Sequence, residues 1–300
     1  MALGRTPNGP EEGPFSLEPL QIGRCRMPAH RPLVMGILNI TPDSFSDGGL
    51  HASLSLALEA AHRMRDDGVD VIDVGGESTR PGAAPVSPAQ EADRVLPVLE
   101  ALQSLGVALS LDSRRPEVVE AALSIGIDMV NDVSGFRDPR MQDLVPQLVA
   151  WGGSVCVMHM QGEPQTMQAD PQYVDVVAEV FGYLMQQRAL LMARGLPSER
   201  IWLDPGFGFG KTTEHNLALL RGLADLSAQG PVLAGLSRKR MLAALSQRKD
   251  QPAERLGASL AAVQAAAIGG ASMVRVHDVK ATVDYLRVLH AVQGHSPALD

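Results

Sequence analysis

The feature that most constrains the fold of this chain is a repeated alternation between short apolar runs and longer amphipathic stretches. Eight such runs occur, each with the length of one buried strand. Strands alternating with helical patterns predict an α/β fold with a parallel sheet, and eight of them predict a single (βα)8 TIM barrel. A doubly wound open sheet would show the same alternation and stays as the structural alternative. The runs are Pro32–Ile40, Val69–Gly76, Val107–Ser113, Met129–Ser134, Ser154–Met160, Ile201–Gly206, Val232–Ser237 and Met273–Asp278.

The stretches between the runs carry the residues that start and end helices. Ser87-Pro88-Ala89-Gln90 has the pattern of a capping box with proline at the first helical position, so we expect a helix to begin there. Val95, Leu99 and Leu102 then fall on one face of that helix. Gly106 can end it in the left-handed conformation.

No linker or change of composition divides residues 16–292, so we expect one barrel domain there. Residues 1–15 predict a disordered N-terminal tail, and residues 293–300 predict a flexible C-terminal tail. We expect Ser16–Arg31 to form a short hairpin that closes the bottom of the barrel. The Ala-rich stretch Ala253–Ile268 predicts a helix covered on more than one side, either by a second subunit of a homodimer or by the barrel alone.

Composition limits the class of protein. The net charge of −8 argues against a surface built to bind nucleic acid, although one local anion site is compatible with it. No apolar run predicts a membrane span, and the N-terminus lacks the apolar segment of a secretory signal. Cys25 and Cys156 lack nearby Cys or His partners and are interpreted as reduced thiols. We therefore expect a cytoplasmic protein whose partners are small molecules.

Polar and charged residues gather where the apolar runs end. In a barrel these ends share one mouth, and reacting groups are found there. Side-chain alternation adds direction, because Leu109 and Leu111 share one face of their run and thereby turn Asp112 toward the interior. The same alternation points Arg275 and His277 in one direction.

The basic residues at these ends predict an anion site. Lys239, Arg275 and His277 bring positive charge to one inner region, which suits a phosphate. The run Arg238-Lys239-Arg240 also fits a solvated helix start, but positive charge there opposes the helix dipole and indicates an anion or carboxylate partner. Because we expect Arg275 at an open mouth, its replacement by alanine should lower turnover by orders of magnitude and leave the fold intact.

The acidic and amide residues predict a second kind of contact. Asp112 and Asp204, with the amide of Asn131, suit a flat ligand that carries several N–H donors and ring acceptors. A purely structural hydrogen-bonding role is the alternative for each of them. His159 fits a buried core histidine and is given no chemical role. The loops after the first two runs are rich in Gly, Pro, Ser and Asp, so we expect them to close over the site.

One motif is a near match to a phosphate-binding loop. Gly206–Thr212 contains the Gly-Lys-Thr ending of the GxxxxGK[ST] pattern. The first glycine of that pattern would fall at Pro205, which has no N–H and a fixed φ. The motif therefore argues against a nucleoside triphosphatase.

Seven blocks of the sequence together resemble the dihydropteroate synthase family. The similarity runs from about residue 18 to about residue 292, with every predicted strand end represented. The resemblance implies a barrel enzyme that joins 6-hydroxymethyl-7,8-dihydropterin diphosphate to 4-aminobenzoate, releasing diphosphate and forming 7,8-dihydropteroate. It also implies Mg²⁺ as cofactor and a homodimer. The blocks are Met35–Gly49, Asp73–Gly82, Asn131–Ser134, Val157–Gln161, Asp204–Asn216, Gly235–Lys239 and Val274–Val279.

The resemblance assigns roles to residues at matching positions. The implied pterin-binding residues are Asp112, Asn131, Met158, Asp204 and Lys239. The implied diphosphate-binding residues are Asn39, which also holds Mg²⁺, Thr79, Arg80, Arg275 and His277. The implied 4-aminobenzoate-binding residues are Phe45, Thr79, Pro81, Phe209, Lys239 and Arg240. The implied catalytic residues are Asp47, Arg80, Lys239, Arg275 and His277.

The chain departs from the family pattern at two places. Arg240 stands where many relatives have serine, which concerns the contact to the substrate carboxylate. Ser113-Arg114-Arg115 replaces a more usual Thr-x-Lys and is interpreted as peripheral. Two alternative functions stay open. A pterin-binding barrel of the methyltransferase kind predicts no dependence on diphosphate, and an inactive paralogue predicts pterin binding without turnover.

Overall fold

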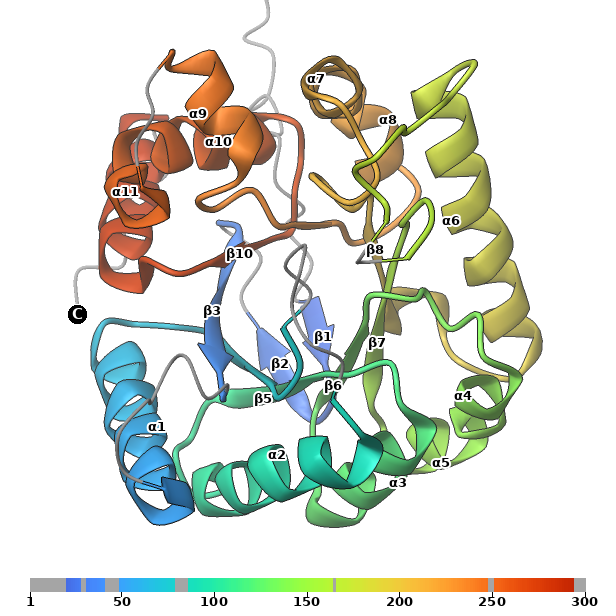
Figure 1. Ribbon diagram of the computed structural model, residues 1–300, viewed down its shortest axis with the longest axis vertical. Helices are drawn as coiled ribbons and strands as arrows, with labels where there is room; N and C mark the ends of the chain where they lie inside the picture. The colour runs from blue at the N-terminus through green and yellow to red at the C-terminus, as the bar shows by residue number, and fades with distance from the viewer. Residues whose placement is uncertain are drawn as a thin grey trace, which may run out of the picture.

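Eight parallel strands form a barrel in which the two ends of the sheet meet (Figure 1). The computed structural model describes residues 20–27, 31–40, 49–78, 86–163, 166–247 and 251–293. The strands pair in the order β8-β7-β6-β5-β4-β3-β10-β9, and a parallel bridge from Leu203 to Val232 joins β8 to the residue before β9. This closure confirms the predicted TIM barrel and excludes the open sheet. The strands are β3 (Leu33–Asn39), β4 (Val71–Gly75), β5 (Ala108–Asp112), β6 (Met129–Asp132), β7 (Ser154–Met158), β8 (Ile201–Asp204), β9 (Leu233–Ala234) and β10 (Met273–Val276).

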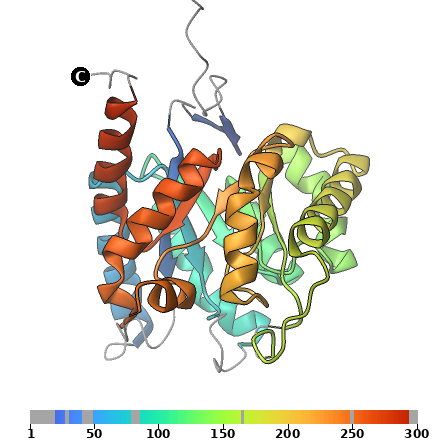
Figure 2. The ribbon, with the colours of Figure 1, turned by 90° about the horizontal axis from the view of Figure 1, so that it is seen from above.

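The helices surround the strands as an outer layer, which Figures 1 and 2 show from two directions. The predicted capping box starts α2, where Ser87 accepts the backbone N–H of Gln90 and Gln90 accepts that of Ser87. The helix expected from Ala253 begins at Leu256, because a 3-10 turn comes first and is closed by the Gln251 and Glu254 side chains. The helices are α1 (Gly49–Asp66), α2 (Pro88–Leu102), α3 (Pro116–Ile125), α4 (Pro139–Asp143), α5 (Val145–Trp151), α6 (Val176–Ala193), α7 (Thr213–Arg221), α8 (Leu223–Ser227), α9 (Arg240–Leu245), α10 (Leu256–Ile268) and α11 (Val279–Val292), with 3-10 turns at Ser198–Arg200 and Pro252–Glu254.

Alternation along each strand separates the residues that face the helices from those that face the barrel interior. On β5, Leu109 and Leu111 belong to the large core beneath the helices, whereas Ala108 belongs to the smaller core inside the barrel. Asp112 shares the parity of Ala108, so the predicted inward direction of this carboxylate is confirmed. The sheet thereby places a charged side chain inside the barrel, at the carboxyl end of its strand.

A two-stranded hairpin closes the opposite end of the barrel, as predicted for this segment. Its strands, β1 (Leu20–Ile22) and β2 (Cys25–Met27), lie within the ring of strands in Figure 1. Ile22 is fully buried in the inner core. Gly23 has φ +52 and donates its N–H to Ser154 Oγ, and a Cβ there would lie 2.4 Å from Asp128 Cα. The close approach requires glycine, and the plugged end leaves the carboxyl end of the barrel for ligands.

The expected N-terminal tail lies outside the described residues, as does all of the expected C-terminal tail except Gln293. The sequence-based predictions of their disorder therefore stay predictions. None of the helices in the described part of the chain combines the length and the apolar composition needed to cross a bilayer.

Candidate active site

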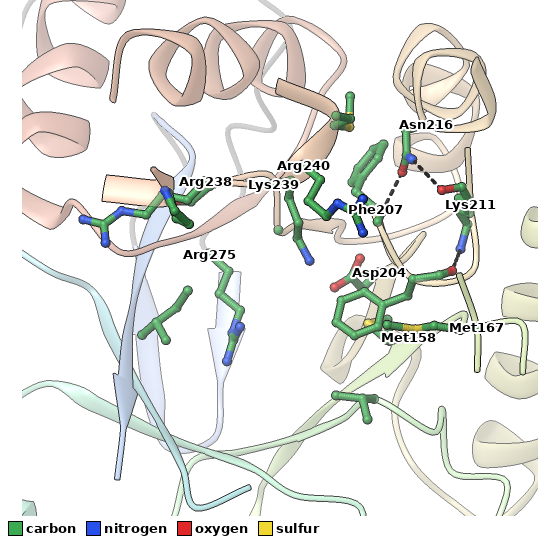
Figure 3. A pocket seen from close by; sticks show the side chains of 18 of the residues that line it. Met158, Met167, Asp204, Phe207, Lys211, Asn216, Arg238, Lys239, Arg240 and Arg275 are labelled. Atoms are coloured by element: carbon green, nitrogen blue, oxygen red, sulfur yellow. Dashed lines mark hydrogen bonds between the residues drawn. The ribbon is translucent and has the colours of Figure 1, made fainter. Parts of the chain in front are cut away.

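A cavity of about 630 Å³ opens at the carboxyl ends of the strands. It brings together side chains that the sequence analysis selected from every part of the barrel. Figure 3 shows Lys239 and Asp204 directed toward each other, with Arg275 to one side of them and Met158 below. The selected residues that line the cavity are Asn39, Asp112, Asn131, Met158, Asp204, Phe209, Lys239, Arg240, Arg275 and His277.

Arg275 is the central cation of this cavity. Its Nε lies 2.6 Å from Asp73 Oδ2, and its second guanidinium nitrogen lies 2.6 Å from Asp112 Oδ2. Burial opposes its charge, but the two carboxylates outweigh burial and raise the pKa of Arg275 above its ordinary value. The guanidinium is therefore a permanent positive charge whose orientation is set by carboxylates from β4 and β5.

Asp73 is a site residue that the sequence analysis did not select. It is fully buried on β4, and its Oδ2 also accepts a hydrogen bond of 3.1 Å from Asn131 Nδ2. Since β5 separates β4 from β6, this contact crosses the barrel interior. The alternation that turned Asp112 inward applies to β4 as well, where Ile72 and Val74 face the helices. The same alternation therefore turns Asp73 inward and is the sequence signal that marks it as a site residue.

Asp112 and one further carboxylate near Arg275, that of Asp204, have their charge partly opposed by burial. Asp204 Oδ1 accepts the N–H of Gly206 at 2.7 Å, and burial raises the pKa of Asp204 despite this bond. Burial, against the influence of Arg275, raises the pKa of Asp112 to about 7. Both groups keep acceptor oxygens inside the cavity, where the low local dielectric of the protein interior strengthens hydrogen bonds to N–H donors.

The raised pKa of Asp112 predicts a pH-dependent affinity for a ligand with N–H donors. Below about pH 7 the folded protein holds Asp112 protonated, so the carboxylate acceptor is lost. We expect binding of a pterin to weaken about tenfold from about pH 8 to about pH 6, because one unit of pKa corresponds to a tenfold change. Calorimetric titration of the chain with 6-hydroxymethylpterin measures this change.

An Asp112→Asn variant is the control, since it removes the titrating group and should bind with little pH dependence. The same raised pKa has a consequence for folding. The folded chain binds this proton more tightly than the unfolded chain, so the contribution of Asp112 to stability falls as pH rises toward 7. Equal wild-type affinity at both pH values would contradict the role of Asp112 as an ionised acceptor.

Lys239 lies near both the carboxylate of Asp204 and the guanidinium of Arg275. It is the residue before α9, and its Nζ lies 4.2 Å from the centre of the Phe209 ring. Burial, only partly offset by Asp204, lowers the pKa of Lys239 to about 8. Gly208 has φ +78, and a Cβ there would lie 3.1 Å from Lys239 Cδ. A larger residue at Gly208 would displace the lysine, so the loop after β8 shapes this part of the cavity.

His277 is held by one neighbouring side chain through two contacts. The backbone N–H of His277 donates to Ser237 Oγ at 3.2 Å, and the same oxygen lies 3.1 Å from His277 Nδ1. When the hydroxyl donates to Nδ1 while accepting from the backbone, the ring proton lies on Nε2. The histidine then presents an N–H donor at the mouth of the cavity, which suits an anion.

The near match to a phosphate loop has a structural role here. The ammonium of Lys211 is buried and contacts the carbonyl oxygens of Gly206, Phe209 and His159 together with His159 Nδ1, at 3.0–3.2 Å. A lysine enclosed by backbone carbonyls does not bind a phosphate, which agrees with the argument against a triphosphatase. Burial lowers the pKa of His159 to about 3, so this histidine is neutral, as expected for a core residue.

The arginines interpreted as peripheral do not line the cavity, but they contact a residue that does. Arg114 Nε lies 3.2 Å from Glu77 Oε2, and one Arg115 nitrogen lies 2.9 Å from Glu77 Oε1. Arg115 also contacts the buried carboxylate of Glu91 at 3.0 Å. Because Glu77 lines the cavity, these pairs connect the loop after β5 to the site. Spacing along the chain carries no signal for pairs of this kind.

Five of the predicted site residues lie outside the described residues, and their roles stay predictions. They are Phe45, Asp47, Thr79, Arg80 and Pro81.

A closed (βα)8 barrel with paired acids and bases at its carboxyl end defines a barrel enzyme, and the comparisons identify its class. The profile of the family described as "Pterin binding enzyme" matches residues 35–277. The chain is 46% identical to the dihydropteroate synthase of Neisseria meningitidis serogroup C over 276 residues, covering 91% of this chain and 96% of the relative. It is 48% identical to the Escherichia coli (strain K12) enzyme of the same name over 262 residues, covering 87% and 91%. This chain belongs to the dihydropteroate synthase family of pterin-binding enzymes.

Solved structures agree with this assignment. The Xanthomonas albilineans dihydropteroate synthase with 4-aminobenzoic acid has a TM-score of 0.85 at 43% identity, covering 94% of this chain and all of that chain. The Burkholderia cenocepacia enzyme complexed with 7,8-dihydropteroate has a TM-score of 0.82 at 46% identity, covering 92% and 97%.

Proposed function

We propose that this chain condenses 6-hydroxymethyl-7,8-dihydropterin diphosphate with 4-aminobenzoate, forming 7,8-dihydropteroate and releasing diphosphate in folate biosynthesis. The observation that carries the proposal is one cavity in which carboxylates and an amide lie beside a group of cations. The similar Burkholderia and Xanthomonas enzymes, whose structures hold 7,8-dihydropteroate and 4-aminobenzoic acid, support these ligands.

The acidic part of the cavity fits the heterocycle. A dihydropterin carries an amino group and ring N–H groups along one edge, and Asp112 and Asp204 offer carboxylate acceptors for them. Asn131 adds an amide, and Met158 offers a polarisable contact for the ring face. Lys239 is the cation that we assign to a ring acceptor. The ring edge that carries the N–H donors then faces Asp112 and Asp204, and this sets the orientation of the ring.

The basic part fits the leaving group. When the bond between the methylene carbon and the diphosphate oxygen breaks, negative charge grows on the diphosphate and positive charge spreads into the ring. Arg275 and His277 lie where they would stabilise that leaving charge, and Arg80 and Thr79 are proposed to assist them. Asp112 and Asp204 stabilise the ring cation, with Asp47 proposed beside them. The amine of 4-aminobenzoate then forms the new C–N bond and loses one proton.

The aminobenzoate is proposed to occupy the outer part of the cavity. Phe209 offers an aromatic face beside Lys239, and Arg240 offers a guanidinium to the substrate carboxylate. Phe45, Thr79 and Pro81 are proposed to complete this part from the first two loops. An arginine in place of the serine of many relatives makes the carboxylate contact charged.

The donor groups at the mouth fit a magnesium ion that is shared with the substrate. Within the described ranges, no three His, Cys, Asp or Glu side chains form a metal-holding group. Mg²⁺ usually retains waters and binds one or two protein oxygens together with substrate phosphates, so a complete protein cage is not required. Asn39 Oδ1, at the end of β3 and facing Gly75, is the oxygen that we assign to it. The ion would neutralise part of the diphosphate charge.

Two broader properties are proposed with the reaction. A homodimer is supported by exposed apolar side chains on the neighbouring helices α10 and α11, namely Ile268, Val288 and Val292, which are 56%, 64% and 80% exposed. Sedimentation of the purified chain tests it. A cytoplasmic location is supported by two cysteines that are both unpaired, Cys25 and Cys156.

The experiment that tests the proposed reaction is diphosphate release by the purified chain. We expect release only when the pterin substrate, 4-aminobenzoate and Mg²⁺ are all present, and a chelator should stop it. Absence of product from folded protein would contradict the proposal. Pterin binding without turnover would favour an inactive paralogue, and binding that ignores the diphosphate group would favour a methyltransferase-type barrel.

A further inference from the structure

We propose that Arg238 and Asp278 are positioning residues that hold Lys239 in place against the pterin site, an inference that rests on the proposed function. Arg238 has φ +59, a left-handed conformation that is uncommon for residues other than glycine. Such a conformation persists only where the surroundings hold it, and it is found most often at functional sites. The contacts of Arg238 therefore show what holds this conformation, and the position of Lys239 shows what the conformation does.

Contacts to the side chain and to both backbone polar groups hold Arg238. Its guanidinium forms a two-bond pair with Asp278, with Nε 3.1 Å from Oδ2 and Nη2 2.5 Å from Oδ1. Its backbone N–H donates to Ser259 Oγ at 3.0 Å. Its carbonyl oxygen accepts from Arg255 at 2.9 Å. Ser259 lies in α10, Arg255 directly precedes α10, and Asp278 directly precedes α11. Long-range packing therefore fixes the conformation.

The pair joins the two loops that supply the central cations. Arg238 directly precedes Lys239, and Asp278 directly follows His277. The contacts between Ser237 and His277 form a second connection one residue away. Two adjacent connections therefore fix the loop after β9 relative to the loop after β10. Figure 3 shows the Arg238 side chain directed away from Asp204, while Lys239 points toward it.

The pair with Asp278 also explains how the basic run Arg238-Lys239-Arg240 is tolerated at the start of α9. The carboxylate partner that the helix dipole called for is Asp278, and it neutralises Arg238 within the protein. Arg238 is thus committed to a structural pair, whereas Lys239 is directed into the cavity. A change in φ at Arg238 would rotate the chain that follows it and move the Lys239 ammonium from its place beside Phe209.

The test compares alanine and glycine at the same position. Arg238→Ala loses the pair and disfavours the left-handed conformation, whereas Arg238→Gly loses the pair but adopts that conformation freely. We expect kcat/KM and pterin affinity to fall about 30-fold in Arg238→Ala, in line with the cost of displacing one catalytic contact. We expect Arg238→Gly to recover several-fold of this loss, and Asp278→Asn to resemble a milder Arg238→Ala.

A matched control is Arg140→Ala, which removes an exposed arginine that also bridges two carboxylates, Glu117 and Asp138. It should keep wild-type kcat, KM and pterin affinity. Thermal unfolding of each variant confirms that it is folded. Wild-type kinetics and pterin affinity in Arg238→Ala would overturn the proposal, as would equal losses in the alanine and glycine variants. If the wild-type chain showed no turnover, the proposed function alone would fail, because pterin affinity still decides the positioning role.

Discussion

Arg275→Ala should lower kcat/KM by about a thousandfold, the range found when a group that stabilises developing charge is removed from an enzyme. The physical reason is its place in the cavity. Arg275 is the permanent cation at the centre of the site, and two carboxylates hold its guanidinium in one orientation. Without it, the departing diphosphate would face the carboxylates of Asp73 and Asp112 without the central cation that offsets their charge. The initial rate of diphosphate release at substrate concentrations below KM measures the effect.

The same variant should also unfold more easily, which differs from the sequence-based expectation of an intact fold. Arg275 lies deeper than an open mouth implied, because its partner Asp73 is fully buried. Removing one partner of a buried ion pair costs about 3 kcal/mol, since the other charge stays buried and unpaired. A double variant, Asp73→Asn with Arg275→Met, removes both charges of the Asp73 pair, while Asp112 still loses its guanidinium partner. It should therefore regain part of the stability without regaining turnover.

Chemical denaturation of the single and double variants separates the two effects. Turnover in the stable double variant near the wild-type rate would show that Arg275 only supports the fold. A wild-type rate in Arg275→Ala would show that the anion site lies elsewhere.

Asp204→Asn should weaken pterin binding by about 10- to 100-fold, which corresponds to about 1.5–3 kcal/mol for a hydrogen bond to a charged group. The amide keeps the shape of the side chain, and its oxygen can still accept from Gly206. Its NH₂ group, however, presents donors where the heterocycle also presents donors. Calorimetry with 6-hydroxymethylpterin measures the loss, and the exposed Asp225→Asn on α8 is the matched control. Unchanged affinity in Asp204→Asn would contradict its role.

The same substitution should make the folded chain more stable near neutral pH. Burial raises the pKa of Asp204, so its ionised form is less favourable in the folded chain than in the unfolded chain. Asparagine removes that ionisation. Higher stability with weaker binding is the expected mark of a residue kept for function.

Local sequence patterns predicted the barrel and the direction of its inner side chains. The alternation of apolar runs predicted eight strands, and the parity of Val107–Asp112 turned Asp112 inward, as the structure has it. The same alternation on β4 turns Asp73 inward. Its hydrogen bond with Arg275, however, is evident only from the structure. The two-residue alternation along strands therefore predicts residues inside the barrel that the loop motifs alone do not.

Pairs between distant segments were beyond what the sequence could show. The dipole argument predicted an anion or a carboxylate partner for the basic run. It could not identify Asp278, which lies 40 positions after Arg238 in the sequence. Arg115 was interpreted as peripheral for the same reason, although it contacts Glu77 and Glu91. Such pairs follow from how the loops of neighbouring strands are brought together, which only the closed barrel determines.

The central claim is a division of the cavity, with acids holding the heterocycle and bases holding the phosphates. The most direct measurement is a crystal structure of this chain with 6-hydroxymethyl-7,8-dihydropterin, diphosphate and Mg²⁺ bound. We expect ring N–H groups within hydrogen-bond distance of Asp112 and Asp204, and phosphate oxygens against Arg275 and His277. Density for the heterocycle outside the barrel, or for diphosphate away from Arg275, would contradict it.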